Sequence, residues 1–541
     1  MLRSRPVMIG RTRSFVGLAG LCAALGSTVV LARCGDDSST CDACADVTAT
    51  PLTVALTPDE IWIHPSDAKP IAVALARSSA GTGDVTVTIE TDAGFTADPL
   101  TIADGKNDGT LVVHVPPSFT QGKTTLLVDA KTASASAQAP LIVHVAGASG
   151  TLDTAFGTNG VVSLDPGGGQ DFPRALIALQ TGVLVGATHV DAASSMKVLR
   201  LAASGAVDGS FATTTTPGDL ASLAMLPDGR IFAVGSLVSG KSDFAAVRIA
   251  AAGGLDPTYA VDTAITSADD FALAAAIQPG GRLVAAGSAG DASVIALSCW
   301  TQVPLPAVDA GADADADLDA EASTADASDA VVSDADASPI TSHLDPTFGD
   351  GGVVTVPSDP ATGARSLLVG ADGSLFALGF ASSDLDAIAL HFGATGALDG
   401  TFGDAGVARV NGVSGAVAAL LEPSGTIAVT TRTSLFHLSS SGAPSATTAL
   451  PANVAATSIA RDPASGALYV GGSSGTQCFV ARYTSALVLD ATFANAGTLV
   501  WSSGDACVVA ALGIDDDGKL LALASVTSSS ATRAAVARYW P

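Results

Sequence analysis

The feature that most constrains the fold is a unit of about 50 residues that recurs through the chain after residue 150. Its first part reads Leu-Asp-x-x-Phe, often continued as Gly-x-x-Gly-Val, and is clearest at Leu344 and Leu398. Its second part is a hairpin of two apolar runs around a Gly turn, and most copies end with a third apolar run. The turn glycines of the seven hairpins are Gly182, Gly229, Gly281, Gly373, Gly425, Gly466 and Gly518.

The spacing of these glycines is regular except at one step. Successive steps are 47, 52, 92, 52, 41 and 52 residues. The long step contains a low-complexity Asp/Ala/Ser tract at 305–342, whose removal restores the common spacing. Because the tract has few aromatic or branched apolar residues, we expect a solvated loop without a packed core.

Four short strands in each repeat predict an all-β fold. Such a unit is typical of a propeller blade, and about seven blades close into a ring without free sheet edges. We therefore predict a β-propeller of about seven blades over 148–541. Each repeat supplies the strand after Gly-Val-Val, the two hairpin strands and a closing strand, so we expect the chain to begin on a blade's first strand and end on a blade's last, without strand exchange at ring closure.

The repeated motifs resemble a known family. The pattern is Leu-Asp-x-x-Phe-Gly-x-x-Gly-Val, then (Pro/Ala)-Asp-Gly-(Arg/Ser/Lys) followed by apolar residues, then Ala-x-x-Arg-Tyr. It is similar to the delta-60 repeat of bacterial secreted and surface proteins, whose biochemical role is uncharacterised. The resemblance spans 150–541, although the sixth repeat has Gly442-Ala-Pro-Ser-Ala in place of the first motif. It implies a propeller and no particular activity, because this fold supports many functions.

The stretch 48–147 predicts a separate small domain. Runs such as PIAVALA (70–76) and VTVTIET (85–91) alternate apolar and polar residues, which favours strands with one solvated face. The size and strand number are those of an immunoglobulin-like β-sandwich. The stretch resembles the Ig-like modules of bacterial surface proteins, which implies a spacer or adhesive role.

The N-terminal residues 1–33 predict a signal peptide. Four arginines precede an apolar run from Phe15 to Ala32. The run ends Leu31-Ala32-Arg33-Cys34, which resembles the lipobox of bacterial lipoproteins, although Arg33 departs from the small residue of that pattern. We expect lipidation of Cys34, a tether over 34–47 and membrane attachment through the lipid. Cleavage after Val30-Leu31-Ala32 would instead give a secreted protein without a lipid; either way the sequence predicts export to the cell envelope or beyond.

The charge balance excludes one class of partner. Fifty-two acidic and 25 basic residues give a net charge of −27. Nucleic acids and anionic lipid surfaces are bound by clustered Lys or Arg, so we expect no nucleic-acid partner.

The seven cysteines are too few for a disulfide scaffold. Cys41 and Cys44 form a CxxC in the tether, which favours a local disulfide or no role over redox or zinc chemistry. Cys478 and Cys507 are candidates for a disulfide between neighbouring repeats, and Cys299 has no evident partner.

The polar positions that recur in the repeats favour structural roles. Each repeated aspartate is expected to cap a turn by accepting the backbone N–H two residues later, rather than to bind calcium. The Phe or Tyr three residues after it is expected to plug the core between blades. The seven histidines are never at metal-ligand spacing, and no metal or cofactor is predicted. The aspartates are Asp153, Asp208, Asp256, Asp345, Asp399 and Asp490; the histidines are His64, His114, His144, His189, His343, His391 and His437.

No catalytic residue is identifiable in the sequence. An HExxH motif is absent from it, and no serine has an identifiable base beside it. The leading hypothesis is a non-enzymatic propeller that binds a polysaccharide or another surface protein. The alternatives are an extracellular hydrolase or lyase acting on sugars or lactones at the central channel, and a purely structural coat protein. Three or more Asp, Glu or His side chains converging at the channel would favour the enzyme, and a concave site of any kind would count against the coat protein.

Overall fold

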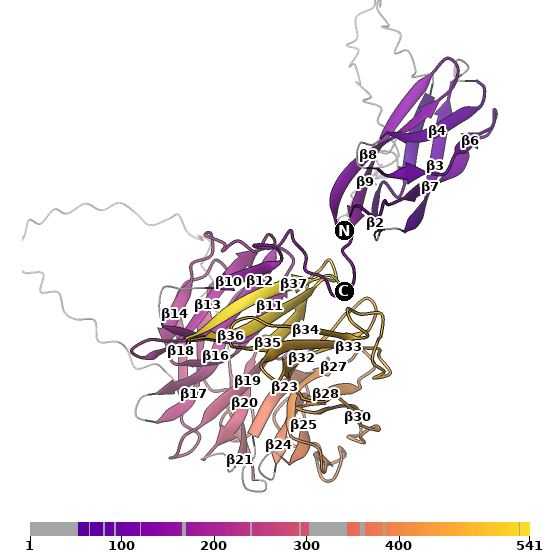
Figure 1. Ribbon diagram of the computed structural model, residues 1–541. Coiled ribbons are helices and arrows are strands. Elements are labelled where there is room, and N and C mark those ends of the chain that lie inside the picture. The colour runs from indigo at the N-terminus through magenta and orange to yellow at the C-terminus, as the bar shows by residue number, and fades with distance from the viewer. Residues whose placement is uncertain are drawn as a thin grey trace, which may run out of the picture. The chain divides into compact units, whose positions relative to one another are not determined.

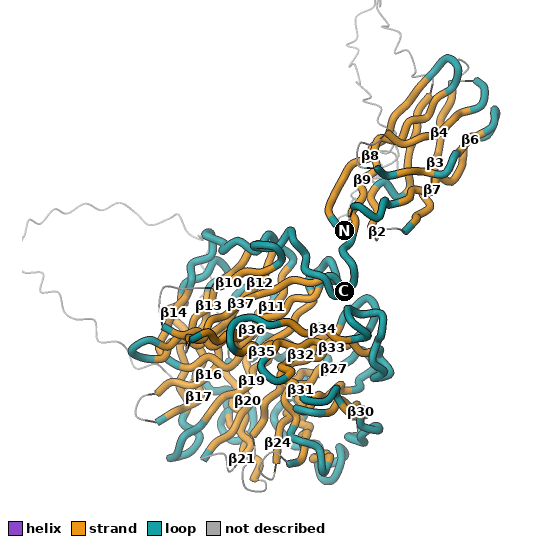
Figure 2. Tube along the Cα trace, viewed as in Figure 1, coloured by secondary structure: helices purple, strands orange, loops and turns teal. Residues whose placement is uncertain are grey.

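The computed structural model describes residues 52–541, apart from 64, 66, 79–81, 91–93, 120, 165–168, 239–240, 291–293, 302–342, 358–362, 382–384 and 530. The signal peptide, Cys34, the tether with Cys41 and Cys44, His64 and the acidic tract at 305–342 lie outside the described residues. The chain divides into two compact units, 1–148 and 149–541. All the regular elements described are strands (Figures 1 and 2), so this part of the chain has no helix long and apolar enough to cross a membrane.

The first unit is a sandwich of two sheets. One sheet has the order β1-β3-β7-β5 and the other β2-β9-β8-β4-β6, in which β2 is parallel to β9. The strands are β1 (Leu52–Thr57), β2 (Glu60–Ile63), β3 (Ala68–Arg77), β4 (Val85–Glu90), β5 (Thr96–Ala97), β6 (Leu100–Ile102), β7 (Asp108–His114), β8 (Gly122–Lys131) and β9 (Ser136–Val145).

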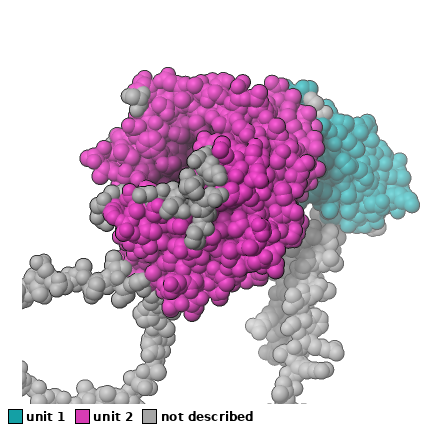
Figure 3. All heavy atoms as spheres, turned by 90° about the horizontal axis from the view of Figure 1, so that it is seen from below, with its two compact units in different colours: residues 1–148 teal, residues 149–541 magenta. Residues whose placement is uncertain are grey.

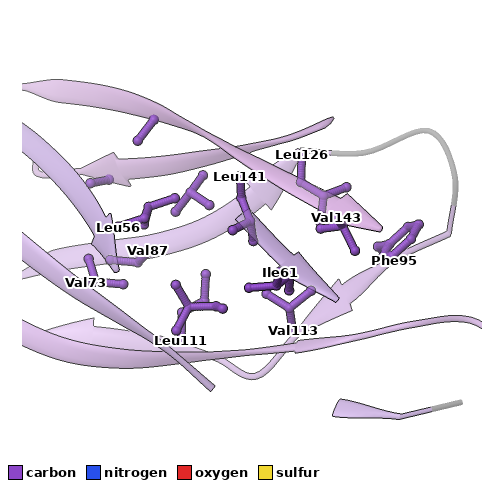
Figure 4. Packing of buried hydrophobic residues seen from close by; sticks show 14 of the residues in the cluster. Leu56, Ile61, Val73, Val87, Phe95, Leu111, Val113, Leu126, Leu141 and Val143 are labelled. Atoms are coloured by element: carbon purple, nitrogen blue, oxygen red, sulfur yellow. The ribbon is translucent and has the colours of Figure 1, made fainter. Parts of the chain in front are cut away.

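One apolar core lies between these two sheets. Alternate residues of β3 are buried, as the alternation of apolar and polar residues predicts. Val73 and Leu111 from one sheet belong to the same cluster as Val87, Leu126 and Val143 from the other (Figure 4). The period of two in the sequence therefore directs one face of each sheet into a shared core.

The second unit contains seven four-stranded antiparallel sheets among its described residues. Their orders are β11-β12-β13-β14, β15-β16-β17-β18, β19-β20-β21-β22, β23-β24-β25-β26, β27-β28-β29-β30, β31-β32-β33-β34 and β35-β36-β37-β10. The strands are β10 (Val161–Leu164), β11 (Gln170–Leu179), β12 (Gly182–Val190), β13 (Ser194–Ala202), β14 (Thr214–Pro217), β15 (Asp219–Met225), β16 (Ile231–Val238), β17 (Ser242–Ile249), β18 (Leu255–Thr263), β19 (Phe271–Ile277), β20 (Leu283–Ala289), β21 (Val294–Trp300), β22 (Val353–Pro357), β23 (Gly363–Val369), β24 (Leu375–Ala381), β25 (Asp386–Phe392), β26 (Val407–Val410), β27 (Ala416–Leu421), β28 (Ile427–Thr431), β29 (Ser434–Leu438), β30 (Thr448–Ala449), β31 (Val454–Arg461), β32 (Leu468–Ser474), β33 (Gln477–Tyr483), β34 (Thr498–Trp501), β35 (Ala506–Ile514), β36 (Leu520–Ser528) and β37 (Ala531–Tyr539).

These sheets pack radially as a β-propeller. The first strand of each sheet contacts the first strand of the next, and β35 contacts β11. The first strands therefore form a closed ring around the axis, and the fourth strands lie at the periphery (Figure 1).

The prediction that the ring closes without strand exchange is wrong. The strand after each Gly-Val-Val is the outer strand of the preceding sheet, so β10 completes the last sheet by pairing antiparallel with β37. The Leu-Asp turn explains the offset. Leu398 bridges back to Phe392, so the chain after the turn runs back along the strand it has just left. At ring closure Leu152 makes the equivalent bridge to Tyr539, which lies at the other end of the sequence. The sequence repeat and the structural sheet are thus out of phase by one strand.

This turn requires a glycine immediately before the valine that begins the outer strand. Gly352 and Gly406 have φ of 100° and 97°, in the region that L side chains rarely adopt. A Cβ on Gly406 would lie 2.4 Å from Cγ of Leu398. The second glycine of Gly-x-x-Gly-Val therefore allows the turn to close tightly over its own leucine.

The aromatic residues of the repeat lie between adjacent sheets, as predicted. Phe348 is fully buried in a cluster that joins β20 and β21 of one sheet to β24 and β25 of the next. Phe156 occupies the equivalent place between the last sheet and the first. Each plug therefore fills the wedge between two sheets rather than the centre of one.

Candidate functional site

A β-bulge interrupts the first strand of each of the seven propeller sheets at an equivalent position. In β11 the pairing register shifts between Pro173 and Ala175, and in β23 between Ala364 and Ser366. A bulge leaves one residue unpaired and redirects its side chain. The seven residues skipped in this way are Arg174, Ala221, Leu273, Arg365, Val417, Thr457 and Ala510.

Four of these bulge residues line one cavity of about 340 Å³. Arg174, Ala221, Leu273 and Arg365 come from four successive first strands, β11, β15, β19 and β23. Because the first strands form the inner ring, a cavity that four of them share lies at the axis. Unit 2 is hollowed on the face seen in Figure 3. We call this space the axial cavity.

The described lining of the axial cavity holds two cations and one carboxylate. Arg174 and Arg365 contribute the guanidinium groups and Asp219 the carboxylate. The guanidinium carbon of Arg365 lies 4.3 Å from the ring centroid of Phe380, which fixes its plane by stacking. Phe271, at the start of β19, is 39% exposed and supplies an aromatic surface to the same cavity. The arrangement can bind an anionic group beside an apolar ring.

The repeated aspartates cap their turns as predicted. One carboxylate oxygen of Asp345 accepts the backbone N–H of Thr347 at 2.9 Å, and also the hydroxyl of that residue at 2.6 Å. The equivalent backbone hydrogen bond occurs at all six aspartates: Asp153, Asp208, Asp256, Asp345, Asp399 and Asp490.

A second role of these aspartates was missed in the sequence. The other carboxylate oxygen binds a cation, which in four of the six repeats comes from the strand that precedes the turn: an arginine at Asp208, Asp256 and Asp490, and His391 at Asp399. Arg482, for example, donates from Nε to Asp490 at 2.9 Å, and its guanidinium carbon lies 5.1 Å from the ring centroid of Phe493. The Arg of the Ala-x-x-Arg-Tyr motif was the available signal. The pairs are Arg538–Asp153, Arg200–Asp208, Arg248–Asp256, Arg282–Asp345, His391–Asp399 and Arg482–Asp490.

At ring closure this turn becomes a buried charge cluster. Asp153 accepts hydrogen bonds from Lys519 and Arg538, both at 2.9 Å, across more than 360 positions of sequence. Burial opposes ionisation of Asp153, but the hydrogen bond from Lys519 and the charges of Arg538 and Lys519 outweigh it and lower the pKa of this carboxyl. Oδ2 of Asp515 lies 3.7 Å from Nη1 of Arg538, and burial raises the pKa of this second carboxyl.

The described histidines lie apart from one another, each with its own contact. His189 pairs with Asp171 at 2.8 Å, His114 with Asp98 at 2.9 Å, and His343 stacks on Tyr259. Within the described ranges no group of three or more His, Cys, Asp or Glu side chains is placed to hold a metal ion.

The two candidate cysteines form the predicted disulfide. Cys478 on β33 and Cys507 on β35 join neighbouring sheets with a Cα–Cα distance of 4.8 Å. Cys299 is a free, buried thiol whose pKa burial raises to about 12, so it is inert toward exchange at neutral pH.

Comparison with known proteins gives a match on part of the propeller. A family model described as "Domain of unknown function (DUF5122) beta-propeller" matches residues 226–259, which include β16, β17 and the turn at Asp256. No curated protein matches the chain.

Solved structures with propeller and surface domains are similar at low identity. The WD40 domain of Pan2 from Neurospora crassa is 11% identical, with 70% of this chain and 94% of that chain covered and a TM-score of 0.26. The extracellular domain of a hybrid two-component system protein from B. thetaiotaomicron is 10% identical over 82% of this chain, with a TM-score of 0.25, and the match spans half of that chain. The surface layer protein SbsC, domains 4–9, is 12% identical over 89% of this chain and 74% of that chain, with a TM-score of 0.14. Together, the strand order of unit 2 and the match at 226–259 establish that the chain contains a β-propeller.

Proposed function

We propose that this protein is an exported, non-enzymatic propeller of seven blades that binds a partner through its axial cavity. The observation that carries the proposal is the ring of seven bulges, which turns one side chain of each inner strand out of the ladder. Four of those side chains line a concave space in the size range of small-molecule sites. A coat protein with a purely structural role has no need for such a cavity.

The chemistry of the cavity favours binding over catalysis. Hydrolysis of a glycosidic bond commonly uses two carboxyl groups on either side of the bond. The described lining residues offer one, Asp219, beside two arginines and several apolar side chains. Arginine orients and neutralises an anion but does not exchange protons at neutral pH, because its pKa exceeds about 12.

Export and anchoring belong to the same proposal. The signal-like residues 1–33 and the lipobox-like Cys34 support attachment to the cell envelope, with the tether and an Ig-like first unit as the spacer. Mass spectrometry of the mature N-terminus from an envelope fraction tests this part. A diacylglyceryl group on Cys34 is the expected result, whereas an unmodified N-terminus after Ala32 would make the protein secreted and unanchored.

Binding and catalysis are separated by one assay on the full mature chain. Acidic and neutral extracellular polysaccharides are incubated with the protein, and both retention and new reducing ends are measured. We expect retention without new reducing ends. Release of reducing ends, or opening of an added lactone, would replace the proposal with the hydrolase or lyase.

A further inference from the structure

Arg174 of the axial cavity differs from the arginines that bind the turn aspartates of the repeats. Arg200, Arg248 and Arg482 each bind the aspartate of the turn that follows their own strand, and Arg538 binds Asp153 at ring closure. Arg174 is exposed, and the structure records no ion pair between it and another described residue. Binding to a turn aspartate therefore does not explain why an arginine stands at position 174.

The position of Arg174 and Arg365 in the ring is also distinctive. The bulge residue is uncharged in five sheets and arginine in the first and the fourth. Both arginines line the same cavity, in a protein whose net charge is −27. With one carboxylate, Asp219, the described lining carries a net charge of +1 in an acidic protein, and nearby charges dominate where water is partly excluded.

The shape of the cations and the remaining lining define the ligand. A guanidinium presents a planar fork of donors that matches a carboxylate or sulfate with two hydrogen bonds. Phe271 and Leu273 offer apolar surface for one face of a ring, and the Asp219 carboxylate accepts hydrogen bonds from hydroxyl groups. An anionic group, a ring with one apolar face and several hydroxyls are the features of an acidic sugar.

We propose that the axial cavity binds an acidic saccharide, with the carboxylate of a hexuronate between Arg174 and Arg365 and its ring against Phe271. This inference rests on the proposed binding function and adds the class of ligand. Asp219 serves as the acceptor for the sugar hydroxyls, and Phe380 holds the Arg365 guanidinium in its binding orientation.

Calorimetric titration of the full mature chain with D-glucuronate tests the proposal, with D-glucose, inorganic sulfate and inorganic phosphate as comparison probes. Loss of a charged hydrogen bond commonly costs about tenfold or more in affinity. We therefore expect Arg174→Ala and Arg365→Ala each to weaken glucuronate binding at least about tenfold, and the double variant to abolish it. Arg365→Lys should restore only part of the affinity, because ammonium lacks the planar fork.

Arg230→Ala is the matched control, since Arg230 pairs with Asp228 on an exposed turn outside the cavity. It should bind glucuronate as the wild type does. Melting curves of all variants verify that they are folded, and Arg174, being exposed, can be replaced without loss of core packing.

Three results would overturn the inference. Wild-type protein that binds none of the probes lacks the site, and sulfate or phosphate bound as tightly as glucuronate would make the site one for simple oxyanions. Glucuronate bound equally well by the double variant would place the sugar elsewhere and leave the proposed binding function intact. Conversion of a glucuronate oligosaccharide by wild type, abolished in the arginine variants, would refute the non-enzymatic function while confirming the ligand.

Discussion

At the scale of the residue, each repeated aspartate has two structural roles. One oxygen of the carboxylate caps the turn, and the other binds the cation that comes from the preceding strand in most repeats. The ion pair contributes most to stability where the carboxylate is buried. Asp153 is 1% exposed and binds both Lys519 and Arg538 at ring closure. Removing the negative charge from this cluster would leave the buried positive charges of Lys519 and Arg538 without a counter-charge.

The charge of Asp153 is therefore expected to stabilise the fold in a pH-dependent way. Asp153→Asn keeps an oxygen for the turn but removes the charge, and should lower the free energy of unfolding by about 3 kcal/mol at pH 7. Since the folded-state pKa of Asp153 is lowered, its contribution is complete above the unfolded value of about 3.9 and is lost as pH falls through the folded value.

Urea unfolding of wild type and Asp153→Asn between pH 7 and pH 3 measures this difference. The gap between the two proteins should be constant at neutral pH and narrow below about pH 4. A gap that stays unchanged down to pH 3 would show that the charge of Asp153 does not stabilise the ring.

The aromatic plug gives a second expectation at this scale. Phe348→Ala should cost about 3–5 kcal/mol in the free energy of unfolding, because it empties a fully buried wedge between two sheets. Phe271→Ala is the control, since Phe271 is 39% exposed. Equal stabilities of the two variants in denaturant melts would refute the role of Phe348 as a plug.

At the scale of the element, much of the strand pattern could be predicted, and its grouping could not. The Gly-turn hairpins such as β15–β16 and β23–β24 were identified from turn chemistry and apolar runs, which are local signals. The sheet membership of β10 was not, because a strand after Gly-Val-Val has the same local sequence whichever sheet it joins. Only the long-range pairing of Leu152 with Tyr539 decides it. The bulges were missed for the same reason.

The disulfide between β33 and β35 makes an element-scale prediction. A cross-link spanning 29 residues restricts the unfolded chain by about 3–4 kcal/mol in the entropic account. Reduced protein should therefore melt earlier than oxidised protein. The double variant Cys478→Ala/Cys507→Ala should melt at one temperature with or without reductant; a shift in that variant would trace the effect to another cysteine.

At the scale of the whole molecule, the acidic tract is predicted to be dispensable for folding. The described residues on either side of it are adjacent, because the backbone N–H of Thr301 donates to the carbonyl of His343 at 2.9 Å and Trp300 bridges to Leu344. Residues 305–342 contain ten acidic and no basic residues, so their deletion also reduces the net charge to −17.

The deletion variant should remain soluble, with the thermal midpoint of the wild type to within about 2 °C, since no pairing in β21 or β22 is removed. Differential scanning calorimetry of the two proteins is the measurement. Insoluble protein, or a midpoint lowered by about 10 °C or more, would show that the tract supports the third sheet.

The central claim is a closed ring in which β10 completes the last sheet. A cysteine pair at Ser163 and Ala535, opposite each other in the β10–β37 register, tests it most directly when disulfides are mapped by mass spectrometry after mild oxidation. We predict a Ser163→Cys/Ala535→Cys cross-link and none for Ser163→Cys/Val536→Cys, because Val536 faces the other side of the sheet. Absence of the first cross-link in folded protein, or equal formation of both, would contradict the closure and with it the axial cavity.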